Sequence, residues 1–249
     1  MKKIVVCGCS FSSPVGGKYT GTHWAEILAT KMNAELVVLA RQGVSNNVIR
    51  LQIDEAVKHN PDWIFINATT PDRIELPVYK DSSKEYTSYV SFEDSAYNPA
   101  TGLKNFNYPG HDNVMISETI FSIIDWPTHP YRDRPLSAEI KFAVKSYAAC
   151  LYDLNWKTQC DNWIIASGLW DLHDRGISFL YNPWVLNTNR LLHGLHKLPA
   201  WFVEKYVLNQ DFDFYKVMRE YKPNVDPGYH TSAEGQMIIA NNYFNRISG

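Results

Sequence analysis

The sequence contains little cysteine and no long apolar run. Its 4 cysteines among 249 residues form no disulfide framework, which favours a reducing compartment. No stretch approaches the roughly 20 apolar residues that a membrane-spanning helix needs. The apolar run at residues 4–7 is too short for a signal peptide. We therefore expect a soluble chain that is not exported and acts in the cytoplasm, whether a cell or a virus encodes it.

Two nucleotide-binding motifs are also missing. No G-x-G-x-x-G follows the first apolar run, and no G-x-x-x-x-G-K-[ST] occurs, so a nucleotide-binding enzyme is disfavoured. A formal net charge of -2 argues against binding nucleic acid by bulk electrostatics. The Cys-Gly-Cys pair at 7–9 lacks further ligands at metal-binding spacing. We expect no metal, no cofactor, no nucleic-acid partner and no membrane partner; the oligomeric state stays open.

The first part of the chain alternates between strand and helix patterns. Three apolar runs typical of buried strands are separated by two helical patterns, and Ser45 is placed to cap the second helix. The strands are expected at 3–7, 35–39 and 63–66, and the helices at 22–31 and 45–58. This alternation predicts an α/β fold with a parallel sheet and right-handed crossovers.

Two polar, aromatic and turn-rich stretches interrupt this alternation. We interpret 77–113 and 171–222 as insertions that form a lid on a single domain spanning 1–249. A fourth strand is expected at 163–166, and a last helix follows the Thr231-Ser232 pair. Further helices are expected at about 114–125 and 136–157.

Hydroxyl and amide residues gather where the expected strands end. Open α/β sheets bind ligands beyond the carboxyl ends of their strands. That edge is predicted to hold Ser10, Gly43 and the segments 67–72 and 167–171. A serine becomes a nucleophile when a base, usually histidine, removes its proton. Of the 8 histidines, His230 is best placed, in a loop before the last helix, and Asp226 could orient its ring.

A resemblance to a known family sharpens this reading. It rests on G-C-S-F-S at 8–12, A-R-Q-G-V-S-N-N at 40–47 and H-T-S-A-E-G-Q at 230–236. Together these blocks resemble the SGNH (GDSL-like) hydrolase superfamily, closest to divergent, phage-type members whose first block reads G-C-S-F. The resemblance covers both ends of the chain and the first three strands, but not the middle. It implies a flavodoxin-like, three-layer α/β/α sandwich with a parallel sheet of about four to five strands.

The same resemblance implies the chemistry of the site. Ser10 would be the nucleophile, His230 its base and Asp226 the partner of that base. The backbone N–H groups of Ser10 and Gly43 would form the oxyanion hole. Asp226 lies four residues before His230, where the family usually has three. The implied activity is hydrolysis of a carboxylic ester, such as an O-acetyl group on a carbohydrate or another small-molecule ester.

The third oxyanion donor departs from the family pattern. It is normally an asparagine in a G-x-N-D block after the third strand, whereas this chain reads N-A-T-T-P-D-R at 67–73. Thr70 occupies roughly the expected place, and Asn46 is another candidate. We take Arg41, Asn67 and Trp170 as candidate substrate-binding residues.

Plainer interpretations stay open at this point. Ser10 and Gly43 could be ordinary turn residues, and His230 could simply cap a helix. Acyl transfer to an alcohol on the same site is an alternative to hydrolysis. A catalytically inactive binding or virion-associated protein with this fold is another, because the G-x-N-D asparagine is missing.

Overall fold

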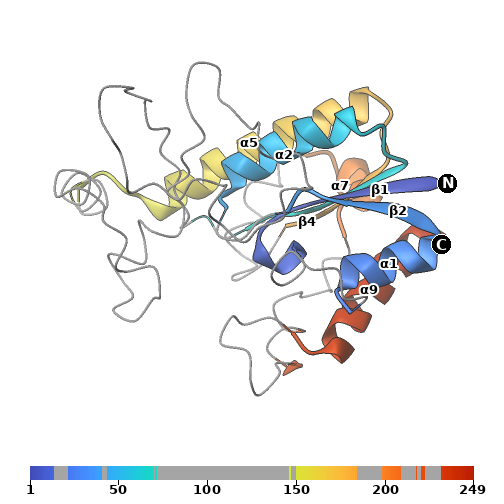
Figure 1. The fold of residues 1–249 in the computed structure, drawn as a ribbon. Helices are drawn as coiled ribbons and strands as arrows, with labels where there is room; N and C mark the ends of the chain where they lie inside the picture. The colour runs from blue at the N-terminus through green and yellow to red at the C-terminus, as the bar shows by residue number, and fades with distance from the viewer. Residues whose placement is uncertain are drawn as a thin grey trace, which may run out of the picture.

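The computed structural model contains a parallel sheet, three of whose strands come from the first 67 residues. The residues that it describes are 1–13, 22–40, 44–69, 71, 146, 150–183, 198–208, 217, 220–221 and 231–249, with only the backbone described at Ser10 and Leu154. The strands are β1 (Lys2–Cys7), β2 (Ala34–Val38), β3 (Trp63–Asn67) and β4 (Phe179–Asn182). Every pair in this 4-stranded sheet is parallel, and the order is β2-β1-β3-β4 (Figure 1). The predicted parallel sheet of about four to five strands is confirmed.

The central strand β1 shows why these residues form a sheet. Val5 pairs with Val37 of β2 on one side and with Ile64 of β3 on the other. Val5 and Ile64 are fully buried. A continuous β-branched run suits a strand that is covered on both faces, whereas an alternating run suits a sheet with one wet face. The core therefore lies on both sides of β1 and β3.

Helices cover both faces of the sheet (Figure 1). One layer contains α1 (Trp24–Met32) and α9 (Ala233–Ser248), which pack against each other. The other contains α2 (Asn46–Lys58) and α5 (Leu154–Asp174), which also pack together, and α7 (Ala200–Tyr206) lies against β4. The predicted three-layer α/β/α arrangement is confirmed.

The helix caps follow the sequence signals. Ser45 Oγ accepts a hydrogen bond from Asn47 N at 3.1 Å and so caps α2. Ser232 Oγ accepts one from Gly235 N at 3.3 Å and caps α9. Both serines were predicted cap positions, and they fix where these two helices begin.

The predicted fourth strand is wrong. Residues 163–166 lie inside α5, and the real edge strand β4 comes later. Ile165, Leu169 and Leu172 are buried at helical spacing, a longer pattern than the four-residue apolar run that looked like a strand. Because β4 and α7 fall inside 171–222, the second predicted insertion supplies part of the sheet. The first, 77–113, lies outside the described residues.

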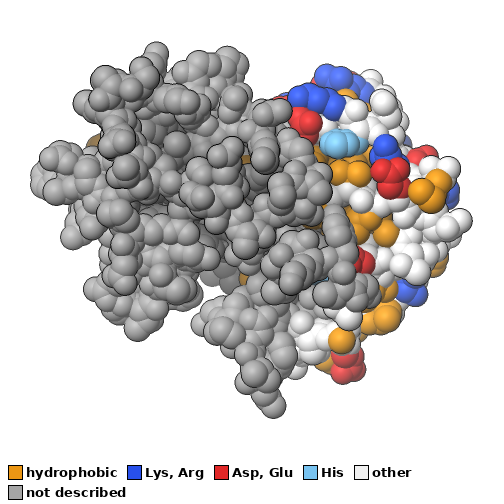
Figure 2. Space-filling model, viewed as in Figure 1, with side chains coloured by type: hydrophobic (Ala, Val, Ile, Leu, Met, Phe, Trp, Pro, Cys, Tyr) orange, Lys and Arg blue, Asp and Glu red, His pale blue; other side chains and the backbone are white. Residues whose placement is uncertain are grey.

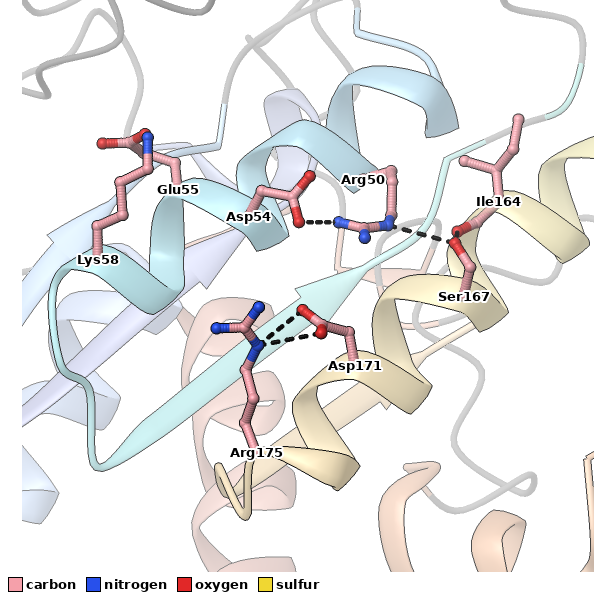
Figure 3. A network of polar contacts seen from close by, with 8 residues as sticks. All are labelled: Arg50, Asp54, Glu55, Lys58, Ile164, Ser167, Asp171 and Arg175. Atoms are coloured by element: carbon pink, nitrogen blue, oxygen red, sulfur yellow. Dashed lines mark hydrogen bonds and ion pairs between the residues drawn. The ribbon is translucent and has the colours of Figure 1, made fainter.

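The outer surface of α2 and α5 carries charges of both signs. Arg50 pairs with Asp54 on its own helix and donates from Nε to Ser167 Oγ of α5 at 3.3 Å (Figure 3). On the face in Figure 2, basic, acidic and apolar side chains are interspersed. None of the helices in the described ranges has the length and apolar character needed to cross a bilayer.

Candidate functional site

The strand order places a candidate site at the carboxyl ends of β1 and β3. The chain leaves β1 for the α1 layer, whereas the next described element after β3 is α5, in the opposite layer. Neighbouring strands whose connections run to opposite faces leave a crevice between their loops, and ligands of open α/β sheets bind there. The segments that follow these two strands are residues 8–13 and 68–69.

A tight turn follows β1. Gly8 has a backbone φ of +153, which residues with a side chain rarely adopt. A Cβ at this position would also lie 2.5 Å from Ser12 Oγ and 3.1 Å from Asn67 O. Ser12 N donates to Cys9 O at 2.9 Å, closing the 3₁₀ turn Ser10–Ser12. Ser10 therefore begins a turn at the end of the strand, as predicted from the sequence.

One tryptophan connects this turn to the C-terminal helix. Trp24 Nε1 donates to Phe11 O at 2.8 Å, and Trp24 N donates to Gln236 Oε1 of α9 at 2.9 Å. Phe11 follows Ser10, and Gln236 lies six positions after His230 in the sequence. The turn of Ser10 and helix α9, which follows His230 in the sequence, are therefore both attached to the start of α1.

The residues just before α9 are fixed as well. Thr231 is buried, and its Oγ1 donates to Tyr221 O at 3.3 Å. Ser232 N donates to the same carbonyl at 2.6 Å. A Cβ at Gly235 would overlap Thr231 Oγ1, so glycine allows this close approach. The residue that follows His230 thus has a defined place.

Gln52 of α2 holds the backbone at the end of β1. Gly8 N donates to Gln52 Oε1 at 2.7 Å, and Gln52 Nε2 donates to Gly8 O at 3.2 Å. The Gln52 side chain is fully buried. One carboxamide therefore satisfies both polar groups of the glycine on which the turn depends.

Asn46 holds the backbone after β3 in the same way. Thr69 N donates to Asn46 Oδ1 at 2.9 Å, and Asn46 Nδ2 donates to Thr69 O at 3.0 Å. The same nitrogen donates to Asp161 Oδ2 of α5 at 3.0 Å. Because both of its N–H bonds are used, Asn46 differs from its predicted role as an oxyanion donor: it holds the loop instead.

Asn67 also differs from its predicted role in substrate binding. It is fully buried at the end of β3, and its Oδ1 accepts hydrogen bonds from Asn182 Nδ2 at 2.9 Å and Tyr243 OH at 2.5 Å. Burial raises the pKa of Tyr243, so this phenol stays protonated. Asn67 thus ties β3 to β4 and α9 inside the core.

Trp170 lies elsewhere. Its predicted place after a strand was based on the wrong fourth strand, and it occupies the later part of α5. Its ring centroid is 4.5 Å from that of Phe202 and 6.0 Å from that of Trp201, both on α7. Because α5 runs antiparallel to the strands it connects, this aromatic group sits toward their amino ends, away from the predicted site.

The remaining predicted site residues lie outside the described part of the chain. They are Arg41, Gly43, Thr70, Asp226 and His230, together with the side chain of Ser10. Their roles stay predictions. Among the described residues, no group of three or more His, Cys, Asp or Glu is arranged to hold a metal ion.

Sequence reasoning missed Gln52 and Asp161. A signal for Gln52 exists: it falls three residues after Ile49 and four before Ala56, within the buried stripe of α2. A polar residue in such a stripe must find a hydrogen-bond partner. No comparable signal marks Asp161, because its partner Asn46 is 115 residues away in the sequence.

Comparison with known proteins identifies the fold. Neither a protein-family model nor a curated protein sequence matches the chain. A similar solved structure is TesA, with TM-score 0.51 and 11% identity over 99% of this chain and 98% of that one. Another is the psychrotrophic esterase EstA from Pseudoalteromonas sp., with TM-score 0.50 and 9% identity over 100% and 97%.

A third is a protein described as lipolytic and of the G-D-S-L family, from Desulfitobacterium hafniense DCB-2. Its TM-score is 0.50 and its identity 11%, over 99% of both chains. At such identities the likeness concerns the fold. The chain has the α/β fold of these three proteins, which confirms the fold that the three sequence blocks predicted.

Proposed function

We propose that this chain, which has the fold of GDSL-type lipolytic proteins and esterases, is a serine hydrolase of carboxylic esters. The observation that carries the proposal is the pair of hydrogen bonds made by Trp24. They attach the turn of Ser10 and the helix that follows His230 to one point at the start of α1. A nucleophile and base far apart in sequence need such a connection.

The proposed reaction has two halves. Ser10 Oγ attacks the acyl carbon of the ester while His230 takes the hydroxyl proton, and His230 then gives that proton to the leaving alcohol. Water then attacks the acyl-enzyme while His230 takes a proton from it, and His230 returns this proton to Ser10 Oγ as the acid is released. Asp226 holds the imidazole in the required tautomer.

Backbone N–H groups would stabilise the oxyanion. Ser10 and Gly43 each offer one, and Thr70 is the remaining candidate for a third donor, since the N–H bonds of Asn46 are engaged. Loss of one such donor costs about 10²–10³ in rate. We propose small acyl groups on an alcohol or a carbohydrate as substrates; Arg41 would contact an anionic one.

A phosphonate probe tests the proposal. EstA, one of the similar structures, is described as inhibited by monoethylphosphonate. We expect a fluorophosphonate to add one adduct to the wild-type chain, seen by intact mass, and none to Ser10→Ala. His230→Ala should label at least about 100-fold more slowly, because the serine loses its base. Hydrolysis of p-nitrophenyl acetate should fall in parallel.

Matched control variants distinguish loss of the catalytic groups from a general effect of substitution. Ser167→Ala and His59→Ala change the same residue types on α5 and at the end of α2, and both should label like the wild type. A folded wild type that takes no adduct and cleaves no ester would overturn the proposal in favour of a binding protein. Adduct formation with ester exchange to an added alcohol, but no hydrolysis, would indicate acyl transfer.

A further inference from the structure

We propose that Gln52 and Asn46 are positioning residues for this reaction. Their carboxamides, both on α2, hold the backbones that follow β1 and β3, and so set the position of the nucleophile's turn relative to the loop that would supply the third oxyanion donor. This inference rests on the proposed function, because it concerns the rate of the same reaction.

The two contacts have the same form. In each, a side-chain oxygen accepts the N–H of a strand-end residue and the side-chain nitrogen donates to the C=O of that same residue. The pairs are Gln52 with Gly8 and Asn46 with Thr69, and all four hydrogen bonds measure 2.7–3.2 Å. Both carboxamides are buried, with exposures of 0% and 1%. One rigid helix thus fixes two loops at once.

Asp161 orients one of the two carboxamides. Its Oδ2 accepts from Asn46 Nδ2 at 3.0 Å, and its Oδ1 pairs with Lys157 Nζ. Asp161 is only 2% exposed. Burial and, to a smaller extent, the charge of Asp161 raise the pKa of Tyr181 on β4. Because the Asp161 carboxylate accepts hydrogen bonds, the Asn46 amide turns its nitrogen, and not its oxygen, toward Asp161.

The chemistry requires an amide at both positions. A carboxylate can accept from the backbone N–H but cannot donate to the C=O, and a hydrocarbon can do neither. A buried carbonyl left without a donor would pull the loop toward another partner. Displacement of catalytic groups by about 1 Å can cost roughly 100-fold in rate.

The place of α2 makes it suitable for this role. Its N-cap Ser45 follows Gly43, the predicted second oxyanion donor, by two positions. Asn46 begins the helix, and Gln52 lies in its middle. The helix is itself attached to α5 on its outer side through Arg50 and Ser167 (Figure 3). Three segments of the proposed oxyanion hole therefore connect to a single element.

The first test is Gln52→Glu. The introduced carboxylate can still accept from Gly8 N but cannot donate to Gly8 O. We expect kcat on p-nitrophenyl acetate to fall about 10- to 100-fold at pH 8, with KM changed less than threefold because the Gln52 side chain is fully buried. Burial raises the pKa of the new carboxyl group. Its protonated form can donate, so the variant-to-wild-type ratio of kcat should rise as the pH falls.

Gln159→Glu is the matched control. It makes the same change on α5, at a half-buried position, and should leave kcat and its pH profile unchanged. If Gln52→Glu is folded and its kcat lies within twofold of the wild type at every pH, the proposal is overturned.

Asn46→Asp is a second, independent variant. It should lower kcat by a similar factor because Thr69 O loses its donor. Adding Asp161→Asn restores a donor to the new carboxylate but none to Thr69 O, so the double variant should stay slow. Full recovery in the double variant would overturn the role assigned to the Thr69 contact. Thermal melting of each variant verifies that the protein is folded.

The two proposals fail in different ways. A wild type that neither cleaves ester nor takes a phosphonate adduct overturns the proposed function, and the positioning role with it. An active wild type whose Gln52 and Asn46 variants are folded and equally fast overturns the positioning role alone.

Discussion

On one face of the sheet, α1 and α9 meet through aromatic rings. On the other, two carboxamides of α2 hold the strand ends, and a carboxylate of α5 orients one of these carboxamides. Trp24 stacks on Tyr243 with ring centroids 4.9 Å apart, and Tyr243 meets Phe65 of β3 edge-on at 5.3 Å. Across the sheet, Gln52 and Asn46 make directional hydrogen bonds to backbone groups. Apolar area is the main source of stability, whereas hydrogen bonds fix geometry. The α1–α9 layer therefore adds apolar packing to the two hydrogen bonds by which Trp24 holds the turn of Ser10 and α9, whereas the α2–α5 layer holds the strand ends by carboxamide hydrogen bonds.

Trp24→Ala should have the largest effect on stability. It removes a fully buried indole, its stack on Tyr243 and its bond to Phe11 O. We expect the free energy of unfolding to fall by about 3–5 kcal/mol, measured by urea denaturation. Trp163→Ala is the control, since that ring is 43% exposed, and it should cost less than about 1 kcal/mol. Equal losses of unfolding free energy in the two variants would contradict the view that the α1–α9 layer contributes more apolar stability.

Tyr243→Phe should have an intermediate and pH-dependent effect. Loss of the bond to Asn67 should cost about 1–2 kcal/mol near pH 8. Burial raises the pKa of Tyr243 in the folded chain, so above about pH 10 only the unfolded chain loses this proton. Stability is therefore complete below that pH and falls above it, by about 1.4 kcal/mol per pH unit for each such tyrosine.

The free energy of unfolding of Tyr243→Phe should fall less steeply with pH, above pH 10, than that of the wild type. Tyr181 and Cys7, whose pKa values are also raised by burial, remain to supply the rest. Urea midpoints measured between pH 8 and 11 compare the two proteins. Identical slopes above pH 10 would contradict the account of Tyr243 as a phenol that stays protonated in the folded state.

Arg50→Ala should have the smallest effect. Its partners Asp54 and Ser167 lie on the outer surface of α2 and α5 (Figure 3). Partly exposed pairs of this kind contribute about 0.2–1 kcal/mol, and less in high salt. A double-mutant cycle with Asp54→Ala at low and high salt measures the coupling. An activity loss as large as that of Gln52→Glu would show that outer contacts position the site too.

The strands and caps near the start of the chain could be predicted because their signals are local. Residues 3–7 contain the continuous β-branched run Ile4–Val6, and Ser45 and Ser232 stand at the starts of helical patterns. β4 could not be found in the same way. Its four residues, Phe-Leu-Tyr-Asn, include no β-branched residue, whereas the equally long run at 163–166 that resembled a strand contains Ile164 and Ile165.

In the candidate site, too, the residues with local sequence signals could be predicted and those with distant partners could not. The place of Ser10 followed from β1 and the glycine before it. Asn46 and Asn67 were recognised as polar residues near the strand ends, but their partners come from α5, β4 and α9. A side chain with two donors and an acceptor looks equally suited to substrate and to backbone until the fold brings a partner to it. The predicted substrate-binding role of Trp170 was based on a fourth strand at 163–166, which is part of α5.

The hydrogen bond from Trp24 to Gln236 joins residues 212 positions apart. Its consequence concerns synthesis. The chain leaves the ribosome from its amino end, so β1 and α1 emerge long before α9 exists. Closing so distant a contact is entropically costly and slow. We expect a nascent chain stalled before residue 236 to hold a formed serine turn and yet remain inert to the phosphonate probe, so that activity would appear only with the last helix.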